Sequence, residues 1–139
     1  MKHTNNGACE YCHELILKYP GFYSDLLNWF MHFQNKHPEC HVACAGRGQV
    51  EQEAAFHRGA SHAHYGSSSH NYNAALDLWV MIDGKYMLPK EWFTKNLEPA
   101  LPPWVEWFGA VGSPYYELPH IQIRGWSQLV KNGILKLVE

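Results

Sequence analysis

The sequence predicts an α+β domain with a small, mainly antiparallel sheet, and three local patterns support this prediction. The stretch 74–81 alternates in hydropathy, as expected for a strand with one buried face. The stretch 120–124 alternates in the same way. Asp83-Gly84 follows the first of these stretches and is a typical hairpin turn into a strand at 85–88. The apolar faces of the two alternating strands would carry Leu76, Leu78, Val80, Ile121 and Ile123.

Length and composition limit the class of protein. The 139 residues argue for a single domain over 1–139, and 14% aromatic residues supply enough material for a packed core. Only 17% of residues are charged and the formal net charge is -2, which excludes a polybasic nucleic-acid binder. No apolar run approaches the roughly 20 residues that span a bilayer, so membrane insertion is not expected. The first ten residues are polar and lack the apolar stretch of a signal peptide, which predicts cytoplasmic synthesis.

The N-terminal third predicts two helices. Residues 1–8 are expected to form a frayed terminus. A helix over 10–19 would direct Leu15, Ile16 and Leu17 inward until Pro20-Gly21 breaks it. Ser24 is a plausible N-cap for the second helix, which would end before Pro38. Its apolar residues at helical spacing are Leu26, Leu27, Phe30 and Phe33.

Shorter elements are expected in the rest of the chain. A strand is predicted at 41–45, a helix at 50–58 stopped by Gly59, and a polar loop at 60–73. Two short helices are predicted within 89–109, and a last helix at 127–132 closed by Gly133. Helical spacing favours burial in the core for Trp104, Trp107 and Phe108.

Histidine is unusually frequent, with ten residues against eleven Lys plus Arg, which directs attention to metal ligands. Asp77 and His120 both lie on the polar faces of predicted strands, and His70 precedes Asp77 by seven residues in the loop that leads into the strand. Two imidazoles and one carboxylate leave a fourth tetrahedral position open, which is typical of a catalytic zinc site. Glu117 lies three residues before His120, where it could act as a general base. Alternatively, His70 is a loop histidine, Asp77 a cap, and His120 a half-buried residue bonded to backbone.

Two ordered motifs resemble those of the LAS metallopeptidases, which include D-Ala-D-Ala carboxypeptidases and phage L-alanyl-D-glutamate endopeptidases. The segment from Ser68 to Asp77, SSHNYNAALD, is similar to the family motif S-x-H-x-x-G-x-A-x-D. Glu117-Leu118-Pro119-His120 resembles the second motif, E-x-x-H. Upstream, Ala45-Gly46-Arg47 and Gln52 are similar to the G-Y-R…Q segment. The resemblance runs from about residue 40 to 124.

The resemblance implies a fold, a cofactor and a set of roles. The fold would be hedgehog/D,D-peptidase-like, with helices on one face of the sheet and the zinc site on the other. One catalytic Zn²⁺ would be bound by His70, Asp77 and His120. Glu117 would activate water and then protonate the leaving amine, and Arg47 would stabilise the oxyanion. Ser68 and Gln52 would contribute to substrate binding.

Two positions depart from the family pattern. Asn73 replaces the usual glycine, and Asn tolerates the left-handed backbone conformation that glycine would supply. The tyrosine of G-Y-R is absent, which leaves Arg58 as an alternative to Arg47 for the oxyanion arginine.

The resemblance predicts a monomeric peptidase of the peptidoglycan stem peptide, cutting between L-alanine and D-glutamate. Without an export signal, such an enzyme would reach the cell wall only after the membrane is permeabilised, as a phage endolysin does. Two alternatives remain: a D-Ala-D-Ala carboxypeptidase or dipeptidase, and a non-catalytic zinc-binding module like the hedgehog domains. Glu117 favours an enzyme, because a binding module needs no base beside the metal.

The four cysteines allow a second, structural metal ion. Cys9-x-x-Cys12 together with Cys40 and Cys44 could close a tetrahedral site, while reduced thiols that simply pack are the alternative. His62-Ala63-His64 would place two imidazoles on one face of an extended segment, at the approach to the catalytic site or as competing ligands.

Overall fold

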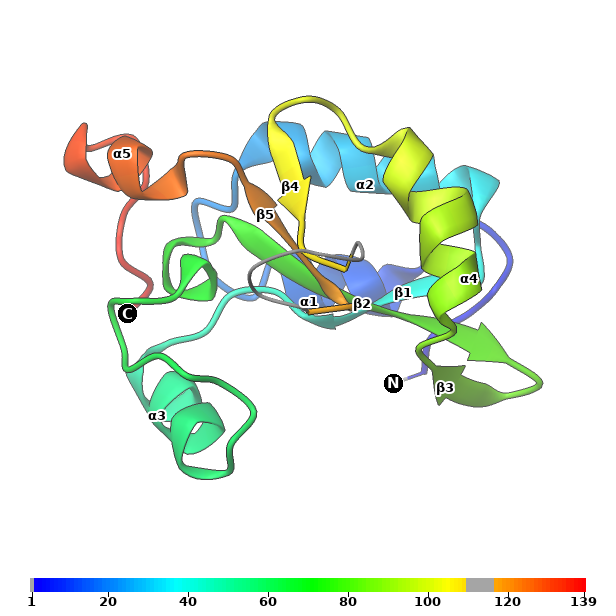
Figure 1. Cartoon of the computed structure of the whole chain (residues 1–139), viewed down its shortest axis with the longest axis horizontal. Helices are drawn as coiled ribbons and strands as arrows, with labels where there is room; N and C mark the ends of the chain where they lie inside the picture. Colours follow the sequence, from blue (N-terminus) through cyan, green and yellow to red (C-terminus); the bar gives the residue numbers. More distant parts are fainter. Residues whose placement is uncertain (1, 110–116) are drawn as a thin grey trace.

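The computed structural model describes residues 2–109 and 117–139, and in these residues it contains one five-stranded sheet (Figure 1). Four strands follow the order β1-β2-β5-β4, while β3 pairs with β2, and every pairing is antiparallel. The predicted α+β class with an antiparallel sheet is therefore confirmed. The strands are β1 (Cys40–Cys44), β2 (Ala75–Ile82), β3 (Lys85–Met87), β4 (Val105–Trp107) and β5 (His120–Ile123).

The central strand β2 has the buried face that its alternation predicts. Leu76, Leu78 and Val80 are fully buried. The hairpin into β3 turns at Asp83 and Gly84, whose φ angles are 51° and 74°. Two consecutive positive φ values define the turn that matches the twist of a hairpin, so the predicted Asp-Gly turn is confirmed.

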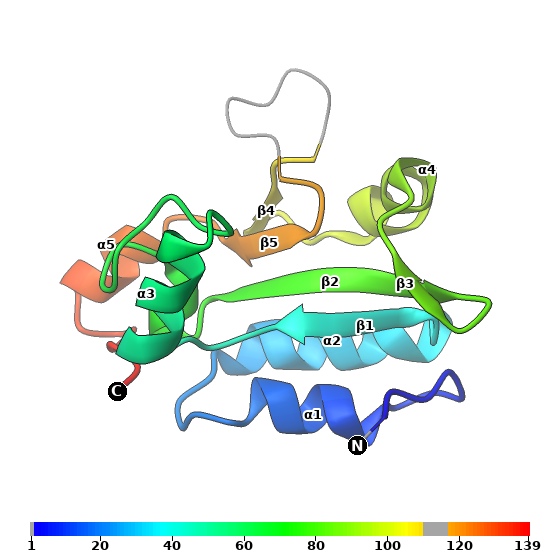
Figure 2. The same cartoon turned by 90° about the horizontal axis from the view of Figure 1, so that it is seen from below.

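Helices α1 (Glu10–Ile16) and α2 (Ser24–Lys36) lie on one side of the sheet (Figure 2). The buried residues of α2 include Leu26, Phe30 and Phe33, as their spacing predicts. The inward position predicted for Leu17 is wrong: α1 ends at Ile16, and Leu17 is 56% exposed.

The remaining helices surround the sheet. They are α3 (Gln49–His57), the 3₁₀ turn η1 (Ser69–Tyr72), α4 (Lys90–Trp92), which continues through the π-helical η2 (Phe93–Leu97) and the 3₁₀ turn η3 (Glu98–Ala100), and α5 (Trp126–Lys131). Within the described part of the chain, no helix is long and apolar enough to cross a membrane.

The second helix predicted within 89–109 is wrong, because β4 lies there. Val105 pairs with Ile123 and Trp107 with Ile121, so β4 forms the outer strand beside β5. The expected burial of Trp107 is nevertheless confirmed, since its side chain belongs to the core. A strand of three residues is too short for its alternation to compete with the apparent helical spacing of the aromatic residues.

Candidate metal centre

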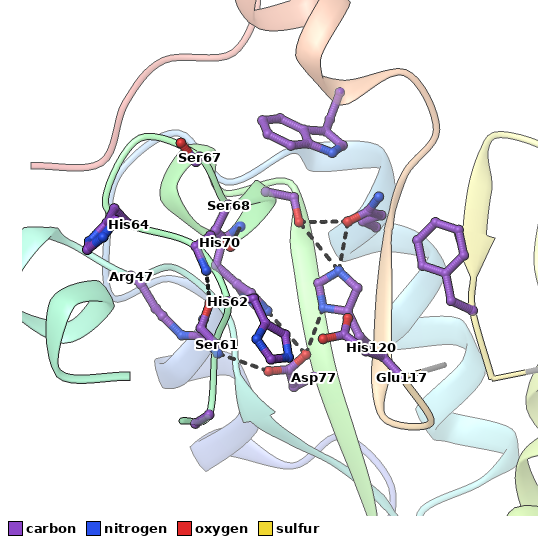
Figure 3. A pocket seen from close by; sticks show the side chains of 16 residues that line it. Arg47, Ser61, His62, His64, Ser67, Ser68, His70, Asp77, Glu117 and His120 are labelled. Atoms are coloured by element: carbon purple, nitrogen blue, oxygen red, sulfur yellow. Dashed lines mark hydrogen bonds and ion pairs between the residues drawn. The ribbon is translucent and has the colours of Figure 1, made fainter. Parts of the chain in front are cut away.

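Three elements bring the predicted zinc ligands together on the face of β2 opposite its aliphatic residues. Asp77 on β2 is paired directly with His120 on β5, and with Cys44 on β1 on its other side. His70 comes from η1, which is capped by the Ser68 hydroxyl accepting from the His70 N–H. Figure 3 shows His70, His120 and Asp77 directed toward one another.

Asn73 ends η1 in the left-handed conformation, with φ 54° and ψ 34°. The expectation that this asparagine can adopt the backbone of the glycine in the family motif is therefore confirmed. The reversal directs the chain from η1 into β2, which allows His70 to reach a residue seven positions further on.

The His70 ring is fixed by its backbone neighbour. Its Nδ1 bonds to the carbonyl oxygen of Ala45, which requires the proton on Nδ1. Its Nε2 is buried and has no hydrogen-bond partner of good geometry in the described residues, while Oδ1 of Asp77 lies 3.1 Å away. In the neutral imidazole this Nε2 carries a lone pair, and that lone pair is available to a metal.

The His120 ring is fixed in the same way by a side chain. Its Nε2 lies 2.8 Å from Oε1 of Gln122, and the amide of Gln122 donates from Nε2 to Glu106 at 2.7 Å. The Glu106 contact fixes the orientation of the amide, so His120 donates from Nε2. Its Nδ1 then faces Oδ1 of Asp77 at 2.9 Å.

Lone pairs on two imidazoles thus point at one carboxylate oxygen, an arrangement that is unfavourable unless a proton or a cation lies among them. The donor set of two imidazoles and a carboxylate is the one that zinc accepts in catalytic sites, so these residues fit the metal. The hydrogen bonds on the far nitrogens supply the outer support that metal-binding histidines usually have.

The electrostatics of the protein without metal agree with this arrangement. Burial would raise the pKa of Asp77, but His70 and His120 hold it well below its usual range. Burial alone would lower the pKa of His70, whereas the Asp77 carboxylate and Cys44 raise it. Without a metal, His70 is therefore a protonated partner of Asp77, and a bound cation takes the place of that proton.

Cys44 and Arg47 complete the surroundings of Asp77. The spacing of the cysteines in the sequence does not predict that Cys44 lies at this site. Candidate ligand atoms of Cys44, His70 and Asp77 lie within 4.8 Å of one another. The thiol, however, lies 4.0 Å from Nδ1 of His70, the nitrogen bonded to Ala45, and it accepts from Nε of Arg47 at 3.2 Å. Arg47 also donates to Oδ2 of Asp77 at 3.2 Å. Cys44 is therefore better placed to support the site than to replace His120 as a ligand.

A pocket of about 690 Å³ opens beside these ligands. Its lining includes Glu117, which is exposed, and Arg47 and Ser68. His62 and His64 also line it, and the Nδ1 of His64 lies 2.9 Å from Oε2 of Glu53 on α3. Phe108 and Trp126 also line the pocket and add aromatic surface. The pocket thus brings the Glu117 carboxylate and the Arg47 guanidinium to the same cavity as the predicted zinc ligands.

Gln52 is fully buried and is not among the residues that line this pocket. Its amide donates to Ser61 and to the carbonyl oxygen of Ala63, and its Oε1 accepts from Arg47 and Asn71. This environment favours a role in positioning Arg47 and the 61–63 segment. The alternative arginine, Arg58, follows α3 and is not among the pocket residues either.

The structure groups the cysteines differently from the expected quartet. Cys9 and Cys12 lie beside His3 and His41, with candidate ligand atoms all within 4.8 Å of one another. Cys40 is fully buried outside this group, and Cys44 lies beside His70 and Asp77. His3 is buried as well, so the terminus is not frayed at this position.

The sheet, the helices on one side of it and the His-Asp-His pocket together define a hedgehog/D,D-peptidase-like fold. Among solved structures, the chain is similar to the crystal structure of the Serratia marcescens L-Ala D-Glu endopeptidase ChiX. The TM-score is 0.65, with 17% sequence identity over 84% of this chain and 89% of the other. No protein-family model and no curated protein sequence matches this chain.

Proposed function

We propose that this chain is a zinc-dependent peptidase that hydrolyses the L-Ala–D-Glu bond in the stem peptide of peptidoglycan. The observation that supports this most directly is the orientation of both imidazoles at Asp77. Each ring donates from its far nitrogen, to Ala45 and to Gln122, and keeps a lone pair for a cation. The similarity in fold to an L-Ala D-Glu endopeptidase supports the substrate class.

His70 Nε2, Asp77 and His120 Nδ1 would hold the zinc ion. Bound there, zinc supplies a Lewis acid that polarises the scissile carbonyl and makes water easier to deprotonate. Three protein ligands leave room for the substrate on the pocket side, and the two fixed imidazoles contribute no reorganisation cost.

Glu117 is the proposed general base. Its carboxylate lines the same pocket as His120 and Asp77, and its exposure leaves it free to approach water. It would accept a proton from the attacking water and transfer that proton to the nitrogen of the leaving D-glutamate. The same carboxylate would serve both proton transfers, from the water and to the leaving nitrogen, and neither transfer requires that it binds the metal.

Arg47 is the proposed stabiliser of the oxyanion. Three of its N–H groups bond to Cys44, Gln52 and Asp77, which hold the guanidinium at the pocket wall. A guanidinium carries five N–H donors, so two remain for developing negative charge on the carbonyl oxygen. Gln52 would act through Arg47, and the Ser68 hydroxyl at the pocket wall would contact the peptide.

The test is digestion of purified peptidoglycan by the zinc-loaded protein, with mass spectrometry of the products. Stem peptides with a new D-glutamate amino terminus are the expected result. Release of D-alanine alone would reassign the chain to the carboxypeptidases. Absence of products with zinc bound would favour the binding module. The His70→Ala variant should lose both metal and hydrolysis, and a full metal complement in that variant would contradict the ligand assignment.

The proposed biological role is that of a phage endolysin acting as a monomer. Expression in a bacterium together with a membrane-permeabilising protein should then cause lysis, and expression alone should not. The Glu117→Gln variant provides the control, because it should keep the metal and fail to lyse the cells.

A further inference from the structure

The second group of ligand atoms lies outside the catalytic pocket. His3 belongs to the N-terminal segment, Cys9 caps α1, Cys12 lies in the first turn of α1, and His41 lies on β1. Cys9, Cys12 and His41 are fully buried and His3 is 9% exposed, and none of the four lines the catalytic pocket. Two thiols and two imidazoles from separate parts of the chain therefore meet in the interior.

The separations between these atoms match those of a metal site. The Nδ1 of His3 lies 3.5 Å from the sulfur of Cys9 and 3.3 Å from that of Cys12. The Nδ1 of His41 lies 3.4 Å from the Cys12 sulfur. Zinc bonds of about 2.3 Å to sulfur and about 2.0–2.1 Å to nitrogen place tetrahedral S and N ligands about 3.5 Å apart.

Hydrogen bonding around His41 leaves its Nδ1 free for a metal. Its Nε2 contacts Oδ1 of Asn5, an acceptor that requires the ring proton on Nε2. The neutral ring then presents the lone pair of Nδ1 to Cys12. Metal-binding imidazoles usually donate their other ring N–H to an acceptor, and Oδ1 of Asn5 is such an acceptor.

Cys12 has more partners than one thiol proton can serve. Its sulfur faces the Nδ1 atoms of both His3 and His41, and it accepts from the backbone N–H of Val42 at 3.3 Å. It also accepts from the side-chain amide of Gln34 at 3.3 Å. The sulfur is thus surrounded by two imidazole nitrogens and two N–H donors, and these donors would stabilise the negative charge of a sulfur bound to a cation.

Gln34 on α2 is fully buried and holds both cysteines in place. Its Oε1 accepts from the N–H of Cys9 at 3.1 Å, while its Nε2 donates to Cys12 and to the carbonyl oxygen of Cys40. A buried amide whose partners lie on α1, at its N-cap and on β1 positions the sulfurs without taking part as a ligand.

We propose that His3, Cys9, Cys12 and His41 bind a structural zinc ion, separate from the catalytic one. Four protein ligands leave no open position, which distinguishes a structural from a catalytic site. The ion would join the N-terminal segment and α1 to β1. Because β1 is an edge strand, the site would also cover the outward N–H of Val42. This inference does not depend on the peptidase activity.

The test measures metal in the full chain purified without chelator, in the His120→Ala background that disables the catalytic site. Elemental analysis should find a zinc equivalent per chain in this background and a second one in the wild type. The cobalt-loaded protein should show a thiolate-to-cobalt charge-transfer band. Cys12→Ser should abolish both signals, whereas Cys44→Ser, which changes a thiol outside the group, should retain them.

A second measurement uses only the His120→Ala protein, so its result does not depend on whether the Cys12→Ser variant folds. A mercurial thiol reagent should release the zinc as Cys9 and Cys12 are modified, and zinc should protect both thiols from alkylation. Zinc-free protein with both thiols freely alkylated would overturn the proposal. A Cys9–Cys12 disulfide in the protein as purified would overturn it as well, and would indicate a redox pair. Neither result would bear on hydrolysis of peptidoglycan.

Discussion

The Nε2 atom of His120 lies 2.8 Å from Oε1 of Gln122, two residues further along the same strand. Period-two geometry places both side chains on one face of β5, and Glu106 on the neighbouring β4 fixes the amide in turn. The hydrogen bond to Gln122 therefore selects which nitrogen of His120 keeps a lone pair for the proposed metal ion.

Replacing Gln122 with Leu should weaken zinc binding at the catalytic site by about 10–100-fold, because the His120 tautomer is no longer fixed. Metal competition with a fluorescent chelator measures this change. Gln128→Leu on the exposed face of α5 is the matched control and should leave the affinity unchanged. Equal affinities in the two variants would show that the Gln122 contact does not support the site.

Replacing Glu117 with Gln should retain zinc and lower kcat for peptidoglycan fragments by about 10²–10⁴-fold, because the attacking water loses its proton acceptor. Metal analysis together with steady-state kinetics measures both properties. Glu98→Gln, at an exposed position of η3, should hydrolyse at the parent rate. Parent-like activity of Glu117→Gln would contradict the assigned role.

The protein stripped of metal should lose stability as the pH rises above neutrality. The pKa of His70 is raised in the folded state, with Asp77 as the main favourable cause against the opposing effect of burial. A raised folded-state pKa gives stability that is complete below the unfolded value of about 6.5 and is lost as the pH approaches the folded value. Between pH 7 and 9 the free energy of unfolding should fall by up to about 1.4 kcal/mol per pH unit from this group.

Urea unfolding of the chelator-treated protein across this pH range measures that slope. The His70→Gln variant lacks the titrating group and provides the reference, so groups that do not interact with His70 cancel in the difference. A slope shared by both proteins would mean that His70 is not protonated beside Asp77.

The core prediction compares a buried leucine with an exposed one. Leu78→Ala on β2 removes a fully buried side chain and should cost about 2–5 kcal/mol in the free energy of unfolding. Leu17→Ala, where the side chain is 56% exposed, should stay within about 0.5 kcal/mol of the parent. Urea titration of both variants measures the difference, and comparable losses would contradict the burial of β2.

Patterns that depend on neighbouring residues could be predicted from the sequence. The alternation around Asp77 and His120 predicted both strands, and the structure places these residues as direct partners in the ladder. The grouping of His70, Asp77 and His120 could be predicted for the same reason, because a loop and two strands limit where those side chains can point. Gln122 lies on the predicted polar face of its strand. Its hydrogen bond to His120 depends on the orientation of the imidazole ring, which is seen only in the structure.

Arrangements that depend on distant parts of the chain could not be predicted. His3 and His41 are 38 positions apart, and they meet because α1 packs against β1. No spacing rule connects them to Cys9 and Cys12, so cysteine counting selected Cys40 and Cys44 instead. Strand β4 was missed for a local reason, because three residues after Pro102-Pro103 carry too little alternation to outweigh the spacing of their aromatic side chains.

The direct pairing of Asp77 with His120 also affects how this protein can diversify. The separation of these two ligands is set by backbone hydrogen bonds between adjacent strands, whereas much of the pocket wall comes from the 60–69 segment. Insertions or substitutions in that segment would therefore change the shape of the proposed peptide site, while the strand ladder keeps the spacing of the two proposed ligands. Evolution, or a designer, could replace the 60–69 segment and change the specificity of the pocket while the pairing of Asp77 with His120 is kept.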